Sequence, residues 1–146
     1  MDVTDRTQLT RLSSDLTVYA ARLVRLVRRE SATTAGTRVL SILDEAGPLS
    51  VTALAQADRC SQPTMTGQVN QLVELGWVAK EPHPDDARSS LVGLTPDGRA
   101  ELRRIRRVNA ALVAKRLARR ADLTPDDLAT AVAVLQAVVD NTEGHS

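Results

Sequence analysis

Residues 50–76, SVTALAQADRCSQPTMTGQVNQLVELG, carry the pattern that decides the fold. Ser50 is a suitable N-terminal cap for a short helix over residues 51–58. After a four-residue break, Ser61 can cap a second helix, which ends at Gly76, a residue suited to the position just beyond a helix. Two short helices joined by a tight turn predict a helix-turn-helix motif.

The second of these helices has one apolar side and one polar side. Met65, Val69 and Leu72 share the apolar side. The opposite side carries Pro63, Thr64, Thr66, Gly67, Asn70 and Gln71. Asn and Gln can pair with adenine edges in a major groove, and Thr can contact bases or a thymine methyl group. A solvated polar face is the alternative, but surface helices more often carry Glu and Lys, so the pattern favours readout of DNA bases.

A β-hairpin is predicted directly after this helix. Residues 77–81 and 90–94 have strand character, and the polar turn between them ends at Arg88. Asp86, two positions earlier, could hold the Arg88 guanidinium in one orientation, which suits a narrow, electronegative minor groove. An exposed ion pair of small energetic value is the alternative for such a loop.

The rest of the chain is predicted to be helical. Leu9, Leu12, Leu16 and Tyr19 begin a heptad-like seam over about residues 5–30. A further helix should start at Thr33 or Thr34 and stop before Gly47-Pro48. Thr-Pro-Asp sequences open two more helices, over about 96–120 and 124–141.

Composition excludes several classes of protein. The chain has no Phe, one Tyr and one Trp, which excludes an aromatic stacking surface for single strands. Cys60 is the only cysteine and His83 and His145 are the only histidines, so no metal site and no cofactor are expected. No catalytic constellation or phosphate loop is visible, so an enzyme is not expected. Without a signal peptide or an apolar run of membrane length, we expect a cytoplasmic protein with no membrane partner.

Taken in order, these segments resemble the MarR family of winged helix-turn-helix transcriptional regulators over residues 39–98. The match consists of Leu54-Ala55, Ser61-Gln-Pro-Thr64, Leu72 followed by Gly76-Trp77-Val78, Asp86-Ala-Arg88-Ser89 and Leu94-Thr95-Pro-Asp-Gly98. The order of helices is similar over nearly the whole chain. The expected fold is mainly α with a small β-hairpin wing and about six helices.

The resemblance implies a homodimer on double-stranded DNA, with a dimer formed by the N- and C-terminal helices. It places a dimerisation helix at residues 1–32, a DNA-binding lobe at 33–95 and dimerisation helices at 96–146, with a recognition helix at 61–75 and a wing at 77–94. The implied dimer contacts are Leu9, Leu12, Leu16, Tyr19, Leu128, Val132, Leu135 and Val139. The implied DNA contacts are Ser61, Gln62, Pro63, Thr64, Thr66, Gly67, Asn70, Gln71, Asp86 and Arg88.

Charge and two departures from the family pattern qualify this picture. Gly67 stands where family members often have an Arg, and Gln68 where they often have an apolar residue. Residues 61–95 carry two basic and four acidic side chains, so phosphate contacts must come from elsewhere; Arg38 and Arg59 are candidates, with plain surface charge as the alternative.

The sequence and the resemblance also bear on regulation. A repressor is favoured over an activator, and the resemblance leaves release by a small lipophilic or phenolic effector open. Cys60, in the turn before the recognition helix, is expected to act as a small hydrophobic residue rather than a redox sensor. The alternative function is a winged-helix module that binds another protein and has weak or no specific DNA binding.

Overall fold

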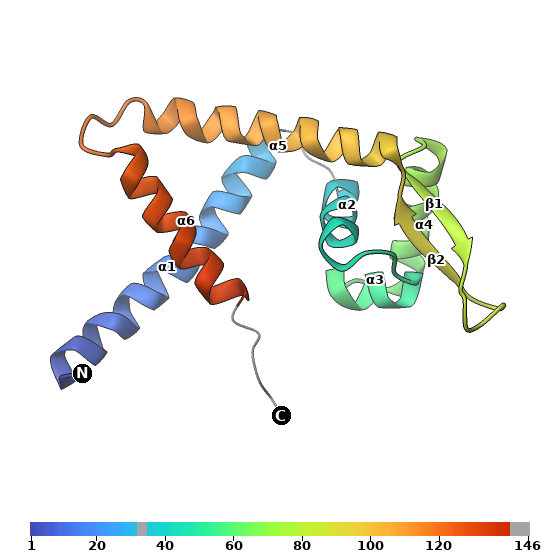
Figure 1. Cartoon of the computed structure of the whole chain (residues 1–146), viewed down its shortest axis with the longest axis horizontal. Helices are drawn as coiled ribbons and strands as arrows, with labels where there is room; N and C mark the ends of the chain where they lie inside the picture. The colour runs from blue at the N-terminus through green and yellow to red at the C-terminus, as the bar shows by residue number, and fades with distance from the viewer. Residues whose placement is uncertain (32–34, 141–146) are drawn as a thin grey trace. The chain divides into compact units, whose positions relative to one another are not determined.

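The computed structural model describes residues 1–31 and 35–140 of the chain. They form six helices and one antiparallel hairpin, which confirms the predicted fold class (Figure 1). The elements are α1 (Val3–Glu30), α2 (Ala35–Ala46), α3 (Val51–Asp58), α4 (Gln62–Glu74), β1 (Val78–Pro82), β2 (Ser90–Leu94), α5 (Pro96–Leu117) and α6 (Pro125–Asp140). The proposed caps at Thr33 and Thr34, and the tail from residue 141, lie outside the described residues. The chain divides into two compact units, residues 1–110 and 111–146.

The core of the first unit lies under the helix-turn-helix and the hairpin. Its fully buried members come from α2, α3, α4 and β2, and they include Leu40, Leu54, Met65 and Val92. The predicted apolar side of α4, Met65 with Val69 and Leu72, is buried as expected. Each such side chain contributes about 1.5–3 kcal/mol of hydrophobic stabilisation. This core fixes α4 with its polar side outward.

The hairpin is joined to the rest of the lobe along the outer edge of β2. Val78 pairs with Leu94 and Pro82 with Ser90 at the two ends of the ladder. On the outer side of β2, Leu49 exchanges two backbone hydrogen bonds with Val92, at 3.0 and 2.7 Å. Leu49, in the segment between α2 and α3, therefore extends the two-stranded sheet by one antiparallel bridge next to β2.

One joint links α4, the hairpin and α5. Thr95 Oγ1 donates a 2.6 Å hydrogen bond to the Gly76 carbonyl, and the Thr95 N–H donates to the Trp77 carbonyl at 3.1 Å. Gly98, in the first turn of α5, packs so closely that an added Cβ would lie 1.9 Å from that Trp77 oxygen. Trp77 itself precedes β1, rather than starting it as predicted, because its N–H donates to Leu72 at the end of α4.

The terminal helices keep their apolar side chains exposed. Neither α1 nor α6 has a buried residue. Seven of the eight predicted dimer residues are exposed, from 36% for Leu135 to 68% for Val139, and Leu16 is half-buried. No helix in the described ranges is both long enough and apolar enough to cross a membrane.

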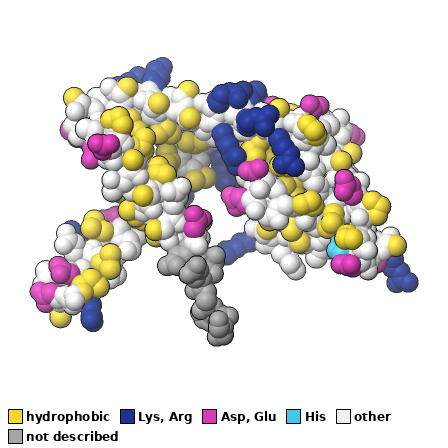
Figure 2. Space-filling view, in the orientation of Figure 1, with side chains coloured by type: hydrophobic (Ala, Val, Ile, Leu, Met, Phe, Trp, Pro, Cys, Tyr) yellow, Lys and Arg dark blue, Asp and Glu magenta, His cyan; other side chains and the backbone are white. Residues whose placement is uncertain are grey.

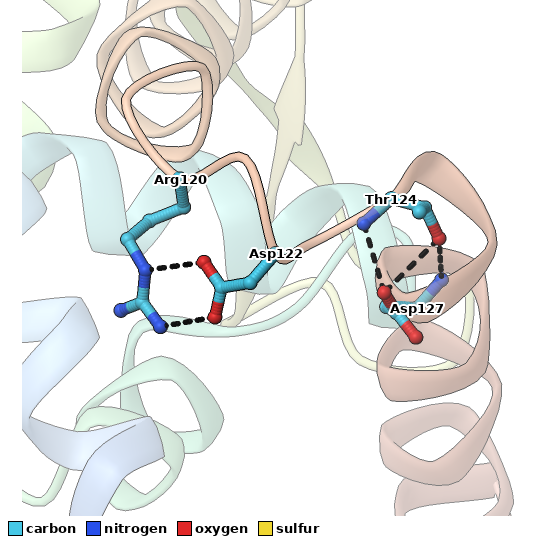
Figure 3. A network of polar contacts seen from close by, with 4 residues as sticks. All are labelled: Arg120, Asp122, Thr124 and Asp127. Carbon is cyan, nitrogen blue, oxygen red and sulfur yellow. Dashed lines mark hydrogen bonds and ion pairs between the residues drawn. The ribbon is translucent and has the colours of Figure 1, made fainter.

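The turn from α5 to α6 is built from charged side chains (Figure 3). Arg120 forms two hydrogen bonds with Asp122, which lower the pKa of that carboxyl group. The Thr124 N–H donates to Asp127 at 2.8 Å, and the Asp127 N–H donates to Thr124 Oγ1 at 3.3 Å. This reciprocal pair is a capping box at the start of α6. Its backbone hydrogen bond is the main cause of the lowered pKa of Asp127.

Gly98→Ala should destabilise the protein, because the new methyl group would collide with backbone rather than with a flexible side chain. We expect a loss of about 1–3 kcal/mol in the free energy of unfolding, measured by denaturant titration. Gly67→Ala is the matched control, since a Cβ there meets nothing within 4 Å. Equal effects of the two substitutions would contradict the close packing at Gly98.

The capping box should make the α6 turn sensitive to acid. The pKa of Asp127 is lower in the folded than in the unfolded chain, so its stabilisation is complete above the unfolded pKa, about 3.9, and is lost as pH falls through the folded pKa. Thermal unfolding between about pH 2 and 6 should therefore show a smaller acid dependence for Asp127→Asn than for the wild type. An unchanged acid dependence in the variant would exclude this contribution.

Candidate nucleic-acid interface

The outward face of α4 is exposed along its length. Pro63, Thr64, Thr66, Gly67, Asn70 and Gln71 are all exposed, as are Ser61 and Gln62. Ser61 also caps the helix, because its Oγ accepts the Thr64 N–H at 3.2 Å and donates to Thr64 Oγ1 at 2.8 Å. These two hydroxyl groups thus order the start of α4, while the amide groups of the next turns remain on its surface.

Gly67 lies in the middle of this face, with open space where a side chain would stand. Its backbone is ordinary helix, so the glycine is not required by the fold. A residue without a side chain lets the backbone approach a partner closely, at a cost of roughly 0.5–1 kcal/mol in helix stability.

Asn70 contacts the wing. Lys80 Nζ, from β1, donates to Asn70 Oδ1 at 3.2 Å. Sequence reasoning did not select Lys80, although it is the only Lys or Arg between Arg59 and Arg88. The lack of other basic residues around Lys80 was the one sequence feature that could have drawn attention to it. Its contact with Asn70 joins residues ten positions apart across a turn, and no local sequence pattern predicts such a contact.

The tip of the wing is ordered by Asp86, though differently from the prediction. Asp86 Oδ1 accepts the backbone N–H of Arg88 at 3.0 Å, and Oδ2 accepts the Ser89 hydroxyl at 3.3 Å. The His83 N–H then donates to the Ser89 carbonyl at 3.1 Å and closes the loop. The expected contact of Asp86 with the Arg88 guanidinium is therefore corrected. Asp86 positions the backbone of Arg88, and the exposed side chain projects from a fixed base.

The two candidate phosphate contacts differ in their surroundings. Arg38 of α2 forms a two-bond ion pair with Asp58 of α3, at 2.9 and 3.3 Å, and this contact raises the pKa of Arg38. Its guanidinium thus already holds two helices together. Arg59 lies at the end of α3 in a left-handed conformation (φ 52°), and its side chain is exposed. Its exposure makes Arg59 the better placed of the two to contact a phosphate.

Two further side chains near α4 are half-buried. Cys60 is half-buried against the core, as expected for a small hydrophobic residue. Gln68 buries its Oε1 without a hydrogen-bond partner among the described residues.

Positive charge gathers away from α4. Residues 61–95 carry two basic and four acidic side chains, whereas residues 99–107 of α5 include five arginines. Dark-blue side chains accordingly cover part of α5 in Figure 2. Arg104 pairs with Glu101 and Arg106 with Asp44, and these contacts reduce the charge available to a partner.

A helix-turn-helix with an exposed polar second helix and an ordered wing defines a winged helix-turn-helix protein. The MarR family model matches residues 32–90. The chain is 31% identical to the HTH-type transcriptional regulator Mb0904 of Mycobacterium bovis, over 90% of this chain and 95% of that protein. The chain belongs to the MarR family.

Solved structures agree with this assignment. Wild-type MarR from E. coli, in its apo form, is 26% identical with a TM-score of 0.65, covering 90% of this chain and 96% of that one. A mutant of E. coli MarR complexed with operator DNA is also 26% identical, with a TM-score of 0.56, covering 95% and 99%. The chain is a DNA-binding transcriptional regulator and not an enzyme.

Gly67→Ala should separate stability from DNA binding. The added methyl group should raise the free energy of unfolding by about 0.5–1 kcal/mol, because alanine favours helix and the space is open. If DNA approaches the backbone there, the same variant should bind its DNA more weakly in a fluorescence anisotropy titration. Unchanged DNA affinity in the stabilised variant would show that Gly67 does not lie against DNA.

Proposed function

We propose that this chain is a homodimeric repressor that binds a pseudo-palindromic operator. In each protomer α4 enters the major groove and Arg88 of the wing enters the adjacent minor groove. The observation that carries the proposal is the uncharged, amide- and hydroxyl-bearing face of α4, held outward by a buried apolar side. Such a face supplies base contacts while adding little non-specific attraction to phosphate.

The exposed terminal helices support the dimer. Leu9, Leu12 and Tyr19 of α1 and Val132 and Val139 of α6 are exposed in the single chain. Helices that expose several apolar side chains are normally covered, and a second copy of the chain covers them in a closed, two-fold arrangement. The two recognition helices then meet successive major grooves about 10 base pairs apart. In this arrangement residues 1–32 and 96–146 dimerise and residues 33–95 bind DNA.

Repression follows from occupancy of a promoter. A dimer on an operator that overlaps a promoter excludes polymerase, and an effector that favours another spacing of the two lobes releases it. We expect the protein to work in the cytoplasm.

A cavity of about 480 Å³ between α1, α2 and α5 supports control by an effector. Val24 and Val27 of α1 and Ile42 of α2 give it apolar walls, and the Arg38–Asp58 pair gives it a charged edge. Its lining has no aromatic side chain, so it suits a lipophilic ligand with one polar end better than a stacked phenol. A ligand that competes for Arg38 would loosen the tie between α2 and α3.

Titration with operator and random duplexes tests the proposal. The operator is obtained by selection from randomised duplexes, and affinities are measured over a range of salt concentrations. Specific binding should exceed random binding by at least about 10³-fold at moderate salt. Arg88→Ala should cost about 1–3 kcal/mol of operator affinity. Arg88→Lys, which keeps the charge but loses the guanidinium fork, should recover only part of this loss.

Equal and feeble binding to both duplexes would contradict the proposal. It would favour instead a winged-helix module that binds another protein through its acidic wing. Full activity of Arg88→Ala would exclude a minor-groove role for the wing while leaving α4 as the specific contact.

A further inference from the structure

The contact between Lys80 and Asn70 changes what the recognition helix can read. Val78 and Lys80 are two residues apart on β1, so their side chains share one face of the hairpin. Val78 is buried in the core, and Lys80 extends from the same face to Asn70 on α4, with 3.2 Å between Nζ and Oδ1. The joint at Gly76, Trp77 and Thr95 fixes where β1 leaves α4. The ammonium group is thus held beside the helix by the fold.

This contact alters the hydrogen-bonding capacity of Asn70. An isolated Asn recognises adenine with both ends of its amide, since Oδ1 accepts from N6 and Nδ2 donates to N7. Here Oδ1 accepts from a cation, and the ammonium group has donors but no acceptor. This bond uses one of the two lone pairs of Oδ1 and places a positive charge beside the other, so the pair presents mainly donors, from Nδ2 and from the remaining protons of Nζ. An adenine amino group at this position would face a positive donor.

We propose that Lys80 and Asn70 act together as a guanine-reading pair, in which the two donors bind the O6 and N7 acceptors of one guanine in each half-site. Guanine is the base whose major-groove edge presents two adjacent acceptors. Lys80 thereby sets the base preference of Asn70 from the wing, which makes it a specificity-determining residue. This inference rests on the proposed function and adds to it the identity of one operator base.

The charge pattern supports a role for Lys80 at the bases. It is the only Lys or Arg in the 28 residues between Arg59 and Arg88. A surface built for phosphate would carry several basic residues, whereas this one carries a single lysine bonded to an amide on the outward face of α4. Contact with a backbone phosphate is the competing role, and it predicts a different result.

Selection of bound sequences from randomised duplexes tests the inference, with wild type, Lys80→Met and Asn70→Ala compared in parallel. Methionine keeps an unbranched apolar stem and removes the donor. Lys115→Met, which removes the other lysine of the chain from outside the winged helix, is the matched control for charge. Thermal unfolding of each variant checks that it is folded.

Wild type and Lys115→Met should prefer guanine at one symmetric position per half-site, by about tenfold over adenine. Lys80→Met should lose this preference or shift it to adenine there, with other positions unchanged. Asn70→Ala should reduce discrimination at the same position.

Two results would overturn the inference in distinguishable ways. If Lys80→Met keeps the wild-type base preferences but binds all sequences more weakly, with a salt slope smaller by about one, Lys80 contacts phosphate and the proposed function stands. If the wild type selects no sequence, the proposed function fails as well.

Discussion

The carbonyl group of Trp77 is the point on which the arrangement of the DNA-binding lobe depends. It accepts a hydrogen bond from the Thr95 N–H, and it lies where a side chain on Gly98 would have to be. Because Trp77 also bonds back to Leu72 of α4, one short segment fixes the end of the recognition helix, the start of the wing and the first turn of α5. A displacement here moves Asn70, Lys80 and Arg88 relative to one another. In the proposed mode of binding, the joint therefore sets the geometry of DNA contact.

The proposed mode of binding separates specificity from general attraction to nucleic acid. The recognition helix carries amides, hydroxyls and a glycine. The two cations of residues 61–95 are each placed by a specific contact: Lys80 by Asn70 and Arg88 by the backbone bond to Asp86. With four acidic side chains in residues 61–95, binding to arbitrary DNA receives little electrostatic support from this surface. A surface of this composition favours discrimination between DNA sequences over high affinity for DNA of any sequence.

Local signals in the sequence were sufficient for the fold. The caps Ser50 and Ser61 and the Met65, Val69 and Leu72 spacing predicted α3 and α4, and both caps are formed as expected. Periodicity could also show which side of α4 faces outward, because that follows from residues three and four apart. The turn sequence suggested a minor-groove role for Arg88, and the family resemblance supported it and assigned the dimer to the terminal helices. The wing role of Arg88 and the dimer contacts remain predictions.

Contacts between distant residues were beyond the reach of such signals. Lys80 with Asn70, Arg38 with Asp58 and Arg106 with Asp44 join elements whose proximity only the folded chain reveals. Asp86 also makes a different bond from the one expected, for a related reason. In a tight turn a carboxylate is closer to the backbone N–H two residues on than to a long side chain, and Asp86 makes that bond. The sequence showed Gly98 as part of a family motif. Only the structure shows why a glycine is needed there, because the Trp77 carbonyl, 21 residues earlier, leaves no room for a side chain.

Half-site spacing tests the central claim most directly. A selected operator is compared with the same operator lengthened by 5 base pairs at its centre, in titrations with the full chain. A dimer that places two α4 helices in successive major grooves should lose most of its specific binding, because about half a helical turn carries one half-site to the opposite side of the duplex. Restoring a whole turn, with about 10 inserted base pairs, moves the half-sites back to one face but beyond the reach of a rigid dimer. Equal affinity for the native and lengthened operators would contradict a two-fold dimer reading DNA through α4.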